Sequence, residues 1–200
     1  MNNNKNFNPK DLLKPLNMIN AYAQGAFPMA DENGNIDWYQ PKERTVIYLD
    51  DYNIPRSLKK FMKETDFVYR LDTATIEVIR SCADRKETWI SDELIEAYKG
   101  IYSLGFLHSV ETYQNNKLVG GLYGIAIGRA FFGESMFSKV SQASKAAFAT
   151  LLKHLEEKEF LLVDVQYQTD HLKMFGTQEI NFEEYTSMLE IAYSREVSFI

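Results

Sequence analysis

The side chains best suited to chemistry occur in two short segments, each of which has a few polar residues between apolar ones. The first is Phe131-Phe132-Gly133-Glu134-Ser135-Met136-Phe137. Strand alternation would put Phe132, Glu134 and Met136 on one face, and a carboxylate between such neighbours is costly to bury unless it is paired. From the pattern, Glu134 is either a solvent-facing or ion-paired glutamate, or an acid at the floor of an apolar pocket that holds a cationic amine.

The second run, residues 161–168, alternates between apolar and polar side chains. Alternation places Asp164 and Gln166 on the same strand face. An amphipathic strand with a solvated face explains this pattern. A hydrogen-bonding ledge inside a cleft also explains it, because an Asp-x-Gln pair can orient an amine, accept its proton and stabilise a carbonyl oxygen.

Metal and cofactor chemistry has little support in the sequence. Cys82 is the single cysteine, which excludes an internal disulfide and a multi-cysteine zinc site. The three histidines, at positions 108, 154 and 171, have no pair at ligand spacing. The glycines at 120, 121, 124 and 128 match no nucleotide-binding loop and fall within a strand pattern, so bulges or close backbone approach are expected there. We therefore expect no metal ion and no organic cofactor.

Length and composition indicate a globular chain with a sizeable core. The 200 residues suit one compact domain, or one domain with a small N-terminal annex, and they are 45% hydrophobic and 25% charged. No run approaches the roughly 18–20 apolar residues of a membrane span, and the polar N-terminus does not resemble a signal peptide. We expect a cytoplasmic protein without a membrane partner.

Charge limits the way in which this chain could bind nucleic acid. The formal net charge of −6 argues against a broadly basic surface, so any RNA contact needs a local patch. Residues 54–63 predict a helix with an apolar face and an opposite basic face. The basic residues, at i, i+3, i+4 and i+7, are Arg56, Lys59, Lys60 and Lys63. A solvated face of an amphipathic helix would give the same pattern.

The remaining segments predict an α+β layout. In the first half we expect helices at 15–24, 73–82 and 92–103, a strand at 45–49, and a turn-rich loop around Pro28 and Asn33-Gly34. Ser91 should cap the third helix and Gly105 should end it. In the second half we expect strands at 107–113, 117–127 and 129–137, with a turn at Asn115-Asn116, then a helix at 142–158, a strand at 160–166 and a helix at 182–191.

Motifs that are individually weak occur in order between Ala21 and Tyr185, across nearly the whole chain. They are Ala21-Tyr22-x-x-Gly25-x-Phe27-Pro28, Glu87-Thr88-Trp89-Ile90, Val119-Gly120-Gly121-Leu122-Tyr123-Gly124, Gly133-Glu134-Ser135-Met136-Phe137-Ser138 followed by Ala143-Ser144-Lys145, and Asp164-x-Gln166. Together they resemble the leucyl/phenylalanyl-tRNA–protein transferase family.

The resemblance implies a fold and an activity. The fold would be an acyltransferase-like core of the GCN5-related type over residues 45–200, with an antiparallel or mixed sheet and flanking helices, preceded by a small N-terminal domain over residues 1–44. The activity would be transfer of Leu or Phe, with Met left open, from aminoacyl-tRNA to acceptor proteins that begin with Lys or Arg. The new peptide bond would mark those proteins for N-degron proteolysis.

The resemblance also implies roles for individual residues. Asp164, Gln166 and Glu134 correspond to catalytic residues, and the basic helix at 56–63 corresponds to a tRNA-contacting cluster. The residues implied in substrate binding are Trp38, Tyr39, Trp89, Tyr98, Leu122, Phe131, Gly133, Ser135, Met136, Phe148 and Val163. Two of them depart from the family pattern: Tyr39 stands where a second tryptophan is frequent, and Leu122 where a methionine is common.

Three other activities compete with this interpretation. An acetyl-CoA-dependent N-acetyltransferase of the same fold would need a glycine-rich pyrophosphate loop, and residues 137–143 contain no glycine. A non-catalytic RNA-binding protein would leave the acidic cluster without a purpose. An arginyl-tRNA transferase of the eukaryotic kind is disfavoured because its N-terminal cysteine cluster is absent. Whether protein groups or ribose hydroxyls would move the proton stays open.

Overall fold

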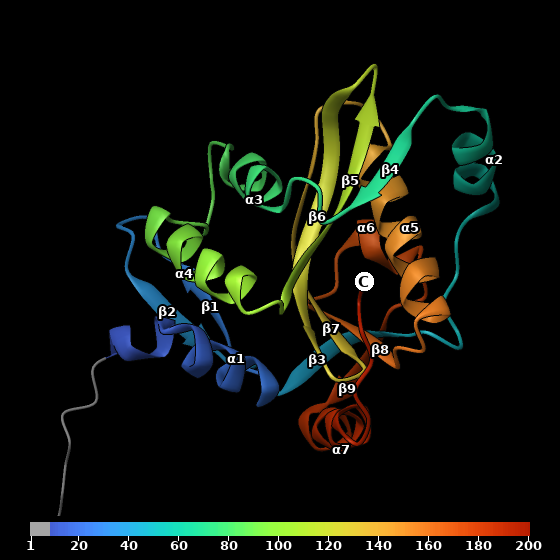
Figure 1. The fold of residues 1–200 in the computed structure, drawn as a ribbon. Helices are drawn as coiled ribbons and strands as arrows, with labels where there is room; N and C mark the ends of the chain where they lie inside the picture. The colour runs from blue at the N-terminus through green and yellow to red at the C-terminus, as the bar shows by residue number, and fades with distance from the viewer. Residues whose placement is uncertain (1–8) are drawn as a thin grey trace, which may run out of the picture.

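The computed structural model describes residues 9–200 and contains a mixed seven-stranded sheet with helices on both faces (Figure 1). The elements follow the order η1 (Pro9–Leu13), α1 (Pro15–Ala23), β1 (Phe27–Ala30), β2 (Ile36–Tyr39), β3 (Glu43–Tyr48), α2 (Arg56–Glu64), β4 (Val68–Leu71), α3 (Thr75–Ala83), α4 (Asp92–Ser103), β5 (Leu107–Gln114), β6 (Lys117–Ile127), β7 (Ala130–Ser138), α5 (Ala143–Glu157), β8 (Leu162–Gln166), α6 (Asp170–Lys173), β9 (Gln178–Asn181) and α7 (Phe182–Tyr193). The expected α+β class with a mixed sheet and flanking helices is confirmed. The first eight residues of the expected N-terminal domain lie outside the described residues.

The sheet is paired along only part of the length of its two parallel strands, β7 and β8. Its strand order is β4-β5-β6-β7-β8-β3-β9, and the β7–β8 pair is parallel whereas the other pairs are antiparallel. Parallel pairing joins residues 130–132 of β7 to residues 162–164 of β8. Beyond these residues β7 continues to Ser138, paired only with β6, and β8 continues to Gln166, paired only with β3, so the two strands separate.

Helices cover both faces of the central strands. α5 contacts β5, β6 and β7 from one side, and α3 contacts the same strands from the other side (Figure 1). α5 approaches closely because its inner face carries small residues: a Cβ on Gly120 of β6 would lie 2.5 Å from the Cβ of Ala143. The glycine-rich strand β6 therefore serves close packing, as its sequence pattern suggested.

Several local predictions are confirmed where short-range chemistry decides the structure. The Ser91 hydroxyl accepts a hydrogen bond from the Leu94 amide and caps α4. Asn115 and Asn116 have φ values of 50° and 59°, the left-handed conformation that a tight hairpin turn requires.

The predicted loop around Pro28 and Asn33-Gly34 is wrong in part, because this segment contains the hairpin β1–β2. Each of these strands has four residues, and Pro28 lies within the first, so neither gives a strong strand pattern. The turn is stabilised by the Asp31 carboxylate, which accepts hydrogen bonds from the amides of Asn33 and Asn35 at 2.8 Å each. The sequence analysis also did not identify the short elements β4, α6 and β9.

The prediction that Phe132, Glu134 and Met136 share one face is wrong. Gly133 pairs with Gly124, and Ser135 pairs with the preceding residue Tyr123, so Glu134 is the extra residue of a β-bulge. A bulge shifts the alternation by one residue.

The bulge directs neighbouring side chains of β7 to opposite sides of the sheet. Phe132 packs in the cluster that contains Tyr98 of α4, and Glu134 accepts a hydrogen bond from that same tyrosine. Met136 packs instead in the cluster that contains Phe148 of α5. One strand therefore presents an acid to the α4 side and an apolar residue to the α5 side.

We predict that Gly124→Ala destabilises the protein. The added Cβ would lie 2.3 Å from the Phe132 carbonyl oxygen and 2.5 Å from the Phe131 ring, in a backbone-lined site that cannot relax freely. We expect a loss on the order of 1–3 kcal/mol in the free energy of unfolding, measured by urea titration. Gly133→Ala is the matched control, since its Cβ would meet only the Asp164 carbonyl oxygen, at 3.5 Å. Equal stability of both variants would contradict this packing.

Candidate active site

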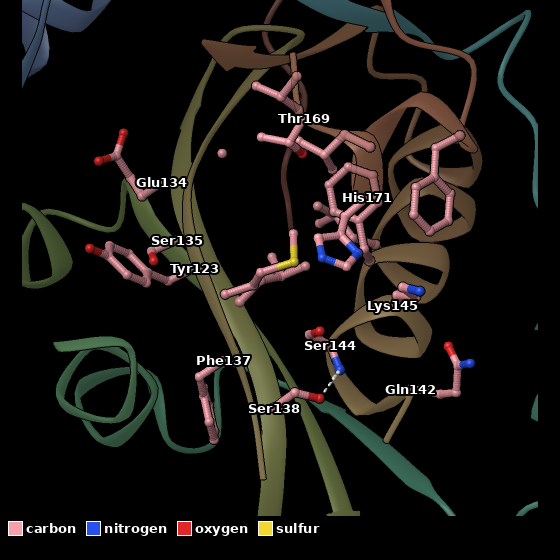
Figure 2. Close-up of a pocket in the computed structure, with 18 of the residues that line it drawn as sticks. Tyr123, Glu134, Ser135, Phe137, Ser138, Gln142, Ser144, Lys145, Thr169 and His171 are labelled. Atoms are coloured by element: carbon pink, nitrogen blue, oxygen red, sulfur yellow. Dashed lines mark hydrogen bonds between the residues drawn. The ribbon is translucent and has the colours of Figure 1, made fainter. Parts of the chain in front are cut away.

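A cleft of about 760 Å³ occupies the place where β7 and β8 separate (Figure 2). Its lining includes β7 from Gly133 to Ser138 and β8 at Val165 and Gln166. The beginning of α5 and the short helix α6 complete the wall on one side. The cleft is thus a direct consequence of the interrupted strand pairing.

One side of the cleft is apolar and lies between β7, α5 and α6. The side chains that form it are Leu122, Met136, Phe148, Leu151, Val165, Leu172 and Phe175. Such a wall suits a branched aliphatic or aromatic side chain. Gly133 adds to the room on this wall, because a Cβ there would meet no protein atom closer than 3.5 Å.

The other side of the cleft is polar and lies between β7 and the α3–α4 region. Glu134, Ser135 and Tyr123 lie there, across the strand from Lys145 and His171 (Figure 2). Arg85 and Trp89 complete this side.

Glu134 is half-buried and held by a hydrogen-bonded chain. Its Oε2 accepts from the Tyr98 hydroxyl at 2.6 Å, and its Oε1 accepts from Gln166 Nε2 at 3.1 Å. The Tyr98 hydroxyl also lies 3.1 Å from the Tyr22 hydroxyl. Burial raises the pKa of Glu134 to about 8, against the opposing effect of the tyrosine hydrogen bonds, and the nearby charge of Asp164 adds to the increase. At pH 7 the carboxyl of the free protein is mostly neutral, and a bound cation would favour its ionised form.

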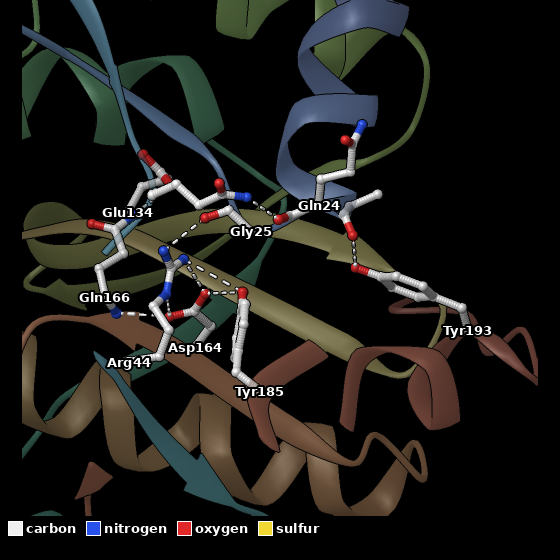
Figure 3. Close-up of polar contacts among 10 residues, drawn as sticks. Gln24, Gly25, Arg44, Glu134, Asp164, Gln166, Tyr185 and Tyr193 are labelled. Carbon is white, nitrogen blue, oxygen red and sulfur yellow. Dashed lines mark hydrogen bonds and ion pairs between the residues drawn. The ribbon is translucent and has the colours of Figure 1, made fainter. Parts of the chain in front are cut away.

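Asp164 is buried, and each of its carboxylate oxygens accepts two hydrogen bonds (Figure 3). Its carboxylate accepts from Arg44 Nε at 3.3 Å and Arg44 Nη2 at 2.5 Å. It also accepts from the Tyr185 hydroxyl at 2.6 Å and the Gln166 amide at 2.8 Å. The expectation that this side chain lies in a cleft is wrong, because its exposed fraction is 0%.

Arg44 is the partner that the sequence analysis did not identify. Its guanidinium is sandwiched between the rings of Phe27 and Tyr185, 4.9 and 4.8 Å from their centroids, and its Nη1 donates to the Gly25 carbonyl at 2.7 Å. A buried, ionised aspartate is stable when it is paired with a cation, and this general rule is the signal that could have indicated a basic partner for Asp164. With 22 lysines and arginines in the chain and no characteristic spacing, sequence alone could not select position 44.

Gln166 connects the buried ion pair to the cleft. It ends β8 with φ of 65°, a left-handed conformation that is uncommon for glutamine. The Asp164 carboxylate holds its amide, and its own side chain reaches Glu134. The main chain of Gln166 is therefore fixed from the buried side while its side chain lines the cleft.

The structure brings eight of the predicted site residues together around the cleft. Those that line the cleft are Trp89, Leu122, Gly133, Glu134, Ser135, Met136, Phe148 and Gln166. Phe131, Val163 and Tyr98 are fully buried and do not line it, which corrects the expectation that the first two form its surface. Tyr98 still contacts the site through Glu134.

Trp38 and Tyr39 lie on the β1–β2 hairpin and do not line the cleft. Tyr39 stacks on Phe27 at 6.1 Å, and Phe27 meets the cleft residue Tyr167 edge-on at 5.9 Å. The hairpin is tied to the cleft by the Ala30 amide, which donates to the Trp89 carbonyl at 3.0 Å. Tyr39 is therefore connected to the cleft through Phe27 and Tyr167.

The four basic residues of α2 are exposed and lie outside the cleft. Lys60 forms an exposed ion pair with Glu64 at 3.8 Å. Their expected contact with tRNA stays a prediction.

Within residues 9–200, the acidic, histidine and cysteine side chains form no cluster that could hold a metal ion. That part of the chain also contains no helix with the length and apolar character of a membrane span. The basic and histidine side chains of the cleft were not predicted as site residues; they are Arg85, Lys139, Lys145 and His171. They come from separate segments, so no local pattern connects them.

Comparisons with known proteins identify the family to which this chain belongs. A model of the leucyl/phenylalanyl-tRNA protein transferase family matches residues 46–190, and a model of the N-terminal domain of the same family matches residues 11–42. The chain is 45% identical to a leucyl/phenylalanyl-tRNA–protein transferase of Chlorobaculum parvum over 194 residues, which are 94% of this chain and 100% of the relative. It is 44% identical to one of Akkermansia muciniphila over 191 residues, which are 93% of this chain and 99% of the relative.

Similarity to solved structures is more distant. L-PGS from Bacillus licheniformis aligns over 91% of this chain and 71% of its own, with 10% identity and a TM-score of 0.44. A protein of unknown function from Staphylococcus epidermidis aligns over 89% and 66%, with 12% identity and a TM-score of 0.46. The family models and the identities above, across nearly the whole chain, confirm the resemblance indicated by the motifs: this chain belongs to the leucyl/phenylalanyl-tRNA–protein transferase family of aminoacyltransferases.

Proposed function

We propose that this chain transfers Leu or Phe from aminoacyl-tRNA to the α-amino group of acceptor proteins that begin with Lys or Arg, and so marks them for N-degron proteolysis. The observation that carries this proposal is the cleft at the end of the β7–β8 pairing, which combines an apolar wall with the acid Glu134. The apolar wall suits the side chain of the donor, and the acid suits the cationic acceptor.

The reaction needs positioning more than activation, because the aminoacyl ester is already an activated acyl group. The α-amine nitrogen attacks the ester carbonyl carbon, the bond from that carbon to the ribose oxygen breaks, and the proton lost by the amine passes to the released oxygen. Met136, Phe148 and Leu122 would hold the aminoacyl side chain. Glu134 would hold the cationic end of the acceptor.

Gln166 and Glu134 are the polar groups placed to contact the reacting atoms, since both line the cleft and are joined by a hydrogen bond. Gln166 can orient the amine through its side-chain oxygen or stabilise the developing oxyanion through its amide. Asp164 acts through Gln166 as a positioning residue, because its carboxylate is already saturated by Arg44, Tyr185 and the Gln166 amide.

The proposal also includes the type of the catalytic core, the boundary of the N-terminal domain and the cellular location. The separated parallel strands with a cleft between them support an acyltransferase-like core of the GCN5-related type over residues 45–200. The matched N-terminal model supports a small domain that ends near residue 44. A cytoplasmic location fits an enzyme whose donor is aminoacyl-tRNA.

The function is tested by transfer of labelled Leu, Phe and Met from tRNA to a Lys-initiated peptide, with acetyl-CoA as a parallel donor. We expect transfer of Leu or Phe and no consumption of acetyl-CoA, because the cleft wall is apolar and residues 137–143 contain no glycine for a pyrophosphate loop. Acetylation without aminoacyl transfer would overturn the assignment.

We predict that Glu134→Gln becomes more stable than the parent as pH rises. The folded carboxyl has its pKa raised from 4.5 to about 8, so folding retains a proton that the unfolded chain has lost between these values. The parent therefore loses stability as pH rises from about 4.5 to 8, whereas glutamine carries no charge to bury. The melting-temperature difference between variant and parent should grow by a few degrees from pH 5 to pH 8, since about 1 kcal/mol corresponds to roughly 2–4 °C at this size.

The exposed Glu190→Gln is the control for this series and should give a flat difference across the same pH range. In the transfer assay, Glu134→Gln should raise the KM for a Lys-initiated peptide and leave the KM for aminoacyl-tRNA nearly unchanged. A pH-independent stability difference would show that Glu134 is already ionised in the folded protein.

We predict opposite consequences for the two members of the Asp-x-Gln pair. Asp164→Asn should cost about 3–5 kcal/mol of stability, because it leaves the charge of Arg44 buried without a counter-ion. Gln166→Ala should retain the melting temperature and lose about 10²–10⁴ in kcat, the usual effect of a positioned polar group in catalysis. A stable, inactive Asp164→Asn would instead restore Asp164 as a residue that contacts the substrate.

A further inference from the structure

The residues that line the cleft carry more positive than negative charges, whereas the chain as a whole carries more negative ones. The sequence contains 28 acidic and 22 basic residues, yet the only carboxylate that lines the cleft within residues 9–200 is Glu134. The cations that line the same cleft are Arg85, Lys139 and Lys145, with His171 beside them. We call the part of the cleft that Lys139 and Lys145 line its mouth. Cations gathered there favour a bound anion.

Lys139 and Lys145 have charges that are available to a ligand. Lys139 follows the end of β7, and its ammonium lies 5.6 Å from the centroid of the Phe137 ring. Within residues 9–200, neither a hydrogen bond nor an ion pair engages Lys145, which projects from the start of α5 (Figure 2). Arg85 differs, because its guanidinium already donates to the Cys82 carbonyl and the Ser135 hydroxyl, each at 2.7 Å.

These lysines adjoin the basic helix α2. The inner face of α2 carries Phe61 and Met62, which pack against the cluster that contains Ala143 and Ala146 of α5. Val140, the neighbour of Lys139, packs against the same cluster. The exposed basic residues of α2 and the lysines at the cleft mouth therefore lie on neighbouring elements, although they are about 80 residues apart in the chain.

We propose that Lys139 and Lys145 bind phosphates of the single-stranded 3′ end of the aminoacyl-tRNA, and that together with α2 they form one path for the nucleic acid into the cleft. This inference rests on the proposed function and names the surface that receives its donor. It also explains how a chain with a net charge of −6 binds a polyanion: the positive charge is concentrated where the RNA passes.

The donor suits this rim better than the acceptor does. The acceptor terminus is cationic and is directed to Glu134, which lies across β7 from Lys145 (Figure 2). Lysines at the mouth would repel it. The donor would place its aminoacyl group on the α5 side, against Met136 and Phe148, and Lys145 belongs to that same helix. The phosphates of its 3′ end would then lie within reach of the lysines that line this part of the cleft.

The test compares three donors that differ in their phosphates: full leucyl-tRNA, the leucylated trinucleotide CCA, and leucyl-adenosine without a phosphate. Transfer to a Lys-initiated peptide is measured with the parent protein, with Lys139→Ala/Lys145→Ala, and with Lys59→Ala/Lys60→Ala on α2. Lys153→Ala/Lys158→Ala is the control for charge. It also removes two positive charges, but from the end of α5 that lies away from the cleft.

We expect Lys139→Ala/Lys145→Ala to raise the KM for the tRNA and for the trinucleotide, and to leave transfer from leucyl-adenosine unchanged. For the trinucleotide, the log–log salt slope should become shallower by about 1.4, or roughly 0.7 for each lost contact to a single-strand phosphate. Lys59→Ala/Lys60→Ala should affect the full tRNA and spare the trinucleotide, and the control should resemble the parent.

Other outcomes overturn the inference in different ways. An unchanged KM and salt slope for the trinucleotide would exclude phosphate contacts at the mouth. An increased KM for acceptors with acidic residues near their N-terminus, and not for donors, would show that the rim binds the acceptor protein. Failure of the parent protein to transfer Leu from any donor would contradict the proposed function itself.

Discussion

The buried ion pair between Arg44 and Asp164 is the interaction on which the site depends. A single buried charge is costly, and the two partners are tolerable only together, with their remaining hydrogen-bonding groups satisfied by Gly25 and Tyr185. These contacts join the end of α1, strands β3 and β8, and helix α7. The same carboxylate holds the amide of Gln166, so an ion pair that does not line the cleft holds the main chain of a residue that does.

Two carboxylates in this region have different surroundings. Asp164 is buried and accepts hydrogen bonds from a guanidinium and two further donors. Glu134 has hydroxyl and amide donors and no cation at hydrogen-bonding distance within residues 9–200, and burial raises its pKa. One carboxyl therefore has a structural ion-pair partner, and the other lines the cleft with a raised pKa and no such partner among the described residues.

Sequence predicted what local chemistry controls. The Ser91 cap and the Asn115-Asn116 turn depend on residues within a few positions of each other, and both were placed correctly. The partner of Asp164 could not be predicted, because Arg44 is 120 positions away and shares no periodicity with it. The bulge at Glu134 was missed for a related reason: an extra residue in a strand is defined by the register with the neighbouring strand, and strict alternation assumes that no bulge exists.

The bulge in β7 and the separation of β7 from β8 explain why β7 presents different side chains to its two faces beside an open cleft. Without the bulge, Glu134 and Met136 would point to the same side, and the acid would lie against the apolar wall. With it, Glu134 and Ser135 belong to the α3–α4 side and Met136 to the α5 side. Because β8 leaves β7 after Phe132, the edge between these sides is open, and Gln166 ends β8 beside it. The apolar wall and Glu134 therefore lie on opposite faces of β7, and the open edge between them adjoins Gln166, whose amide the buried Asp164 holds.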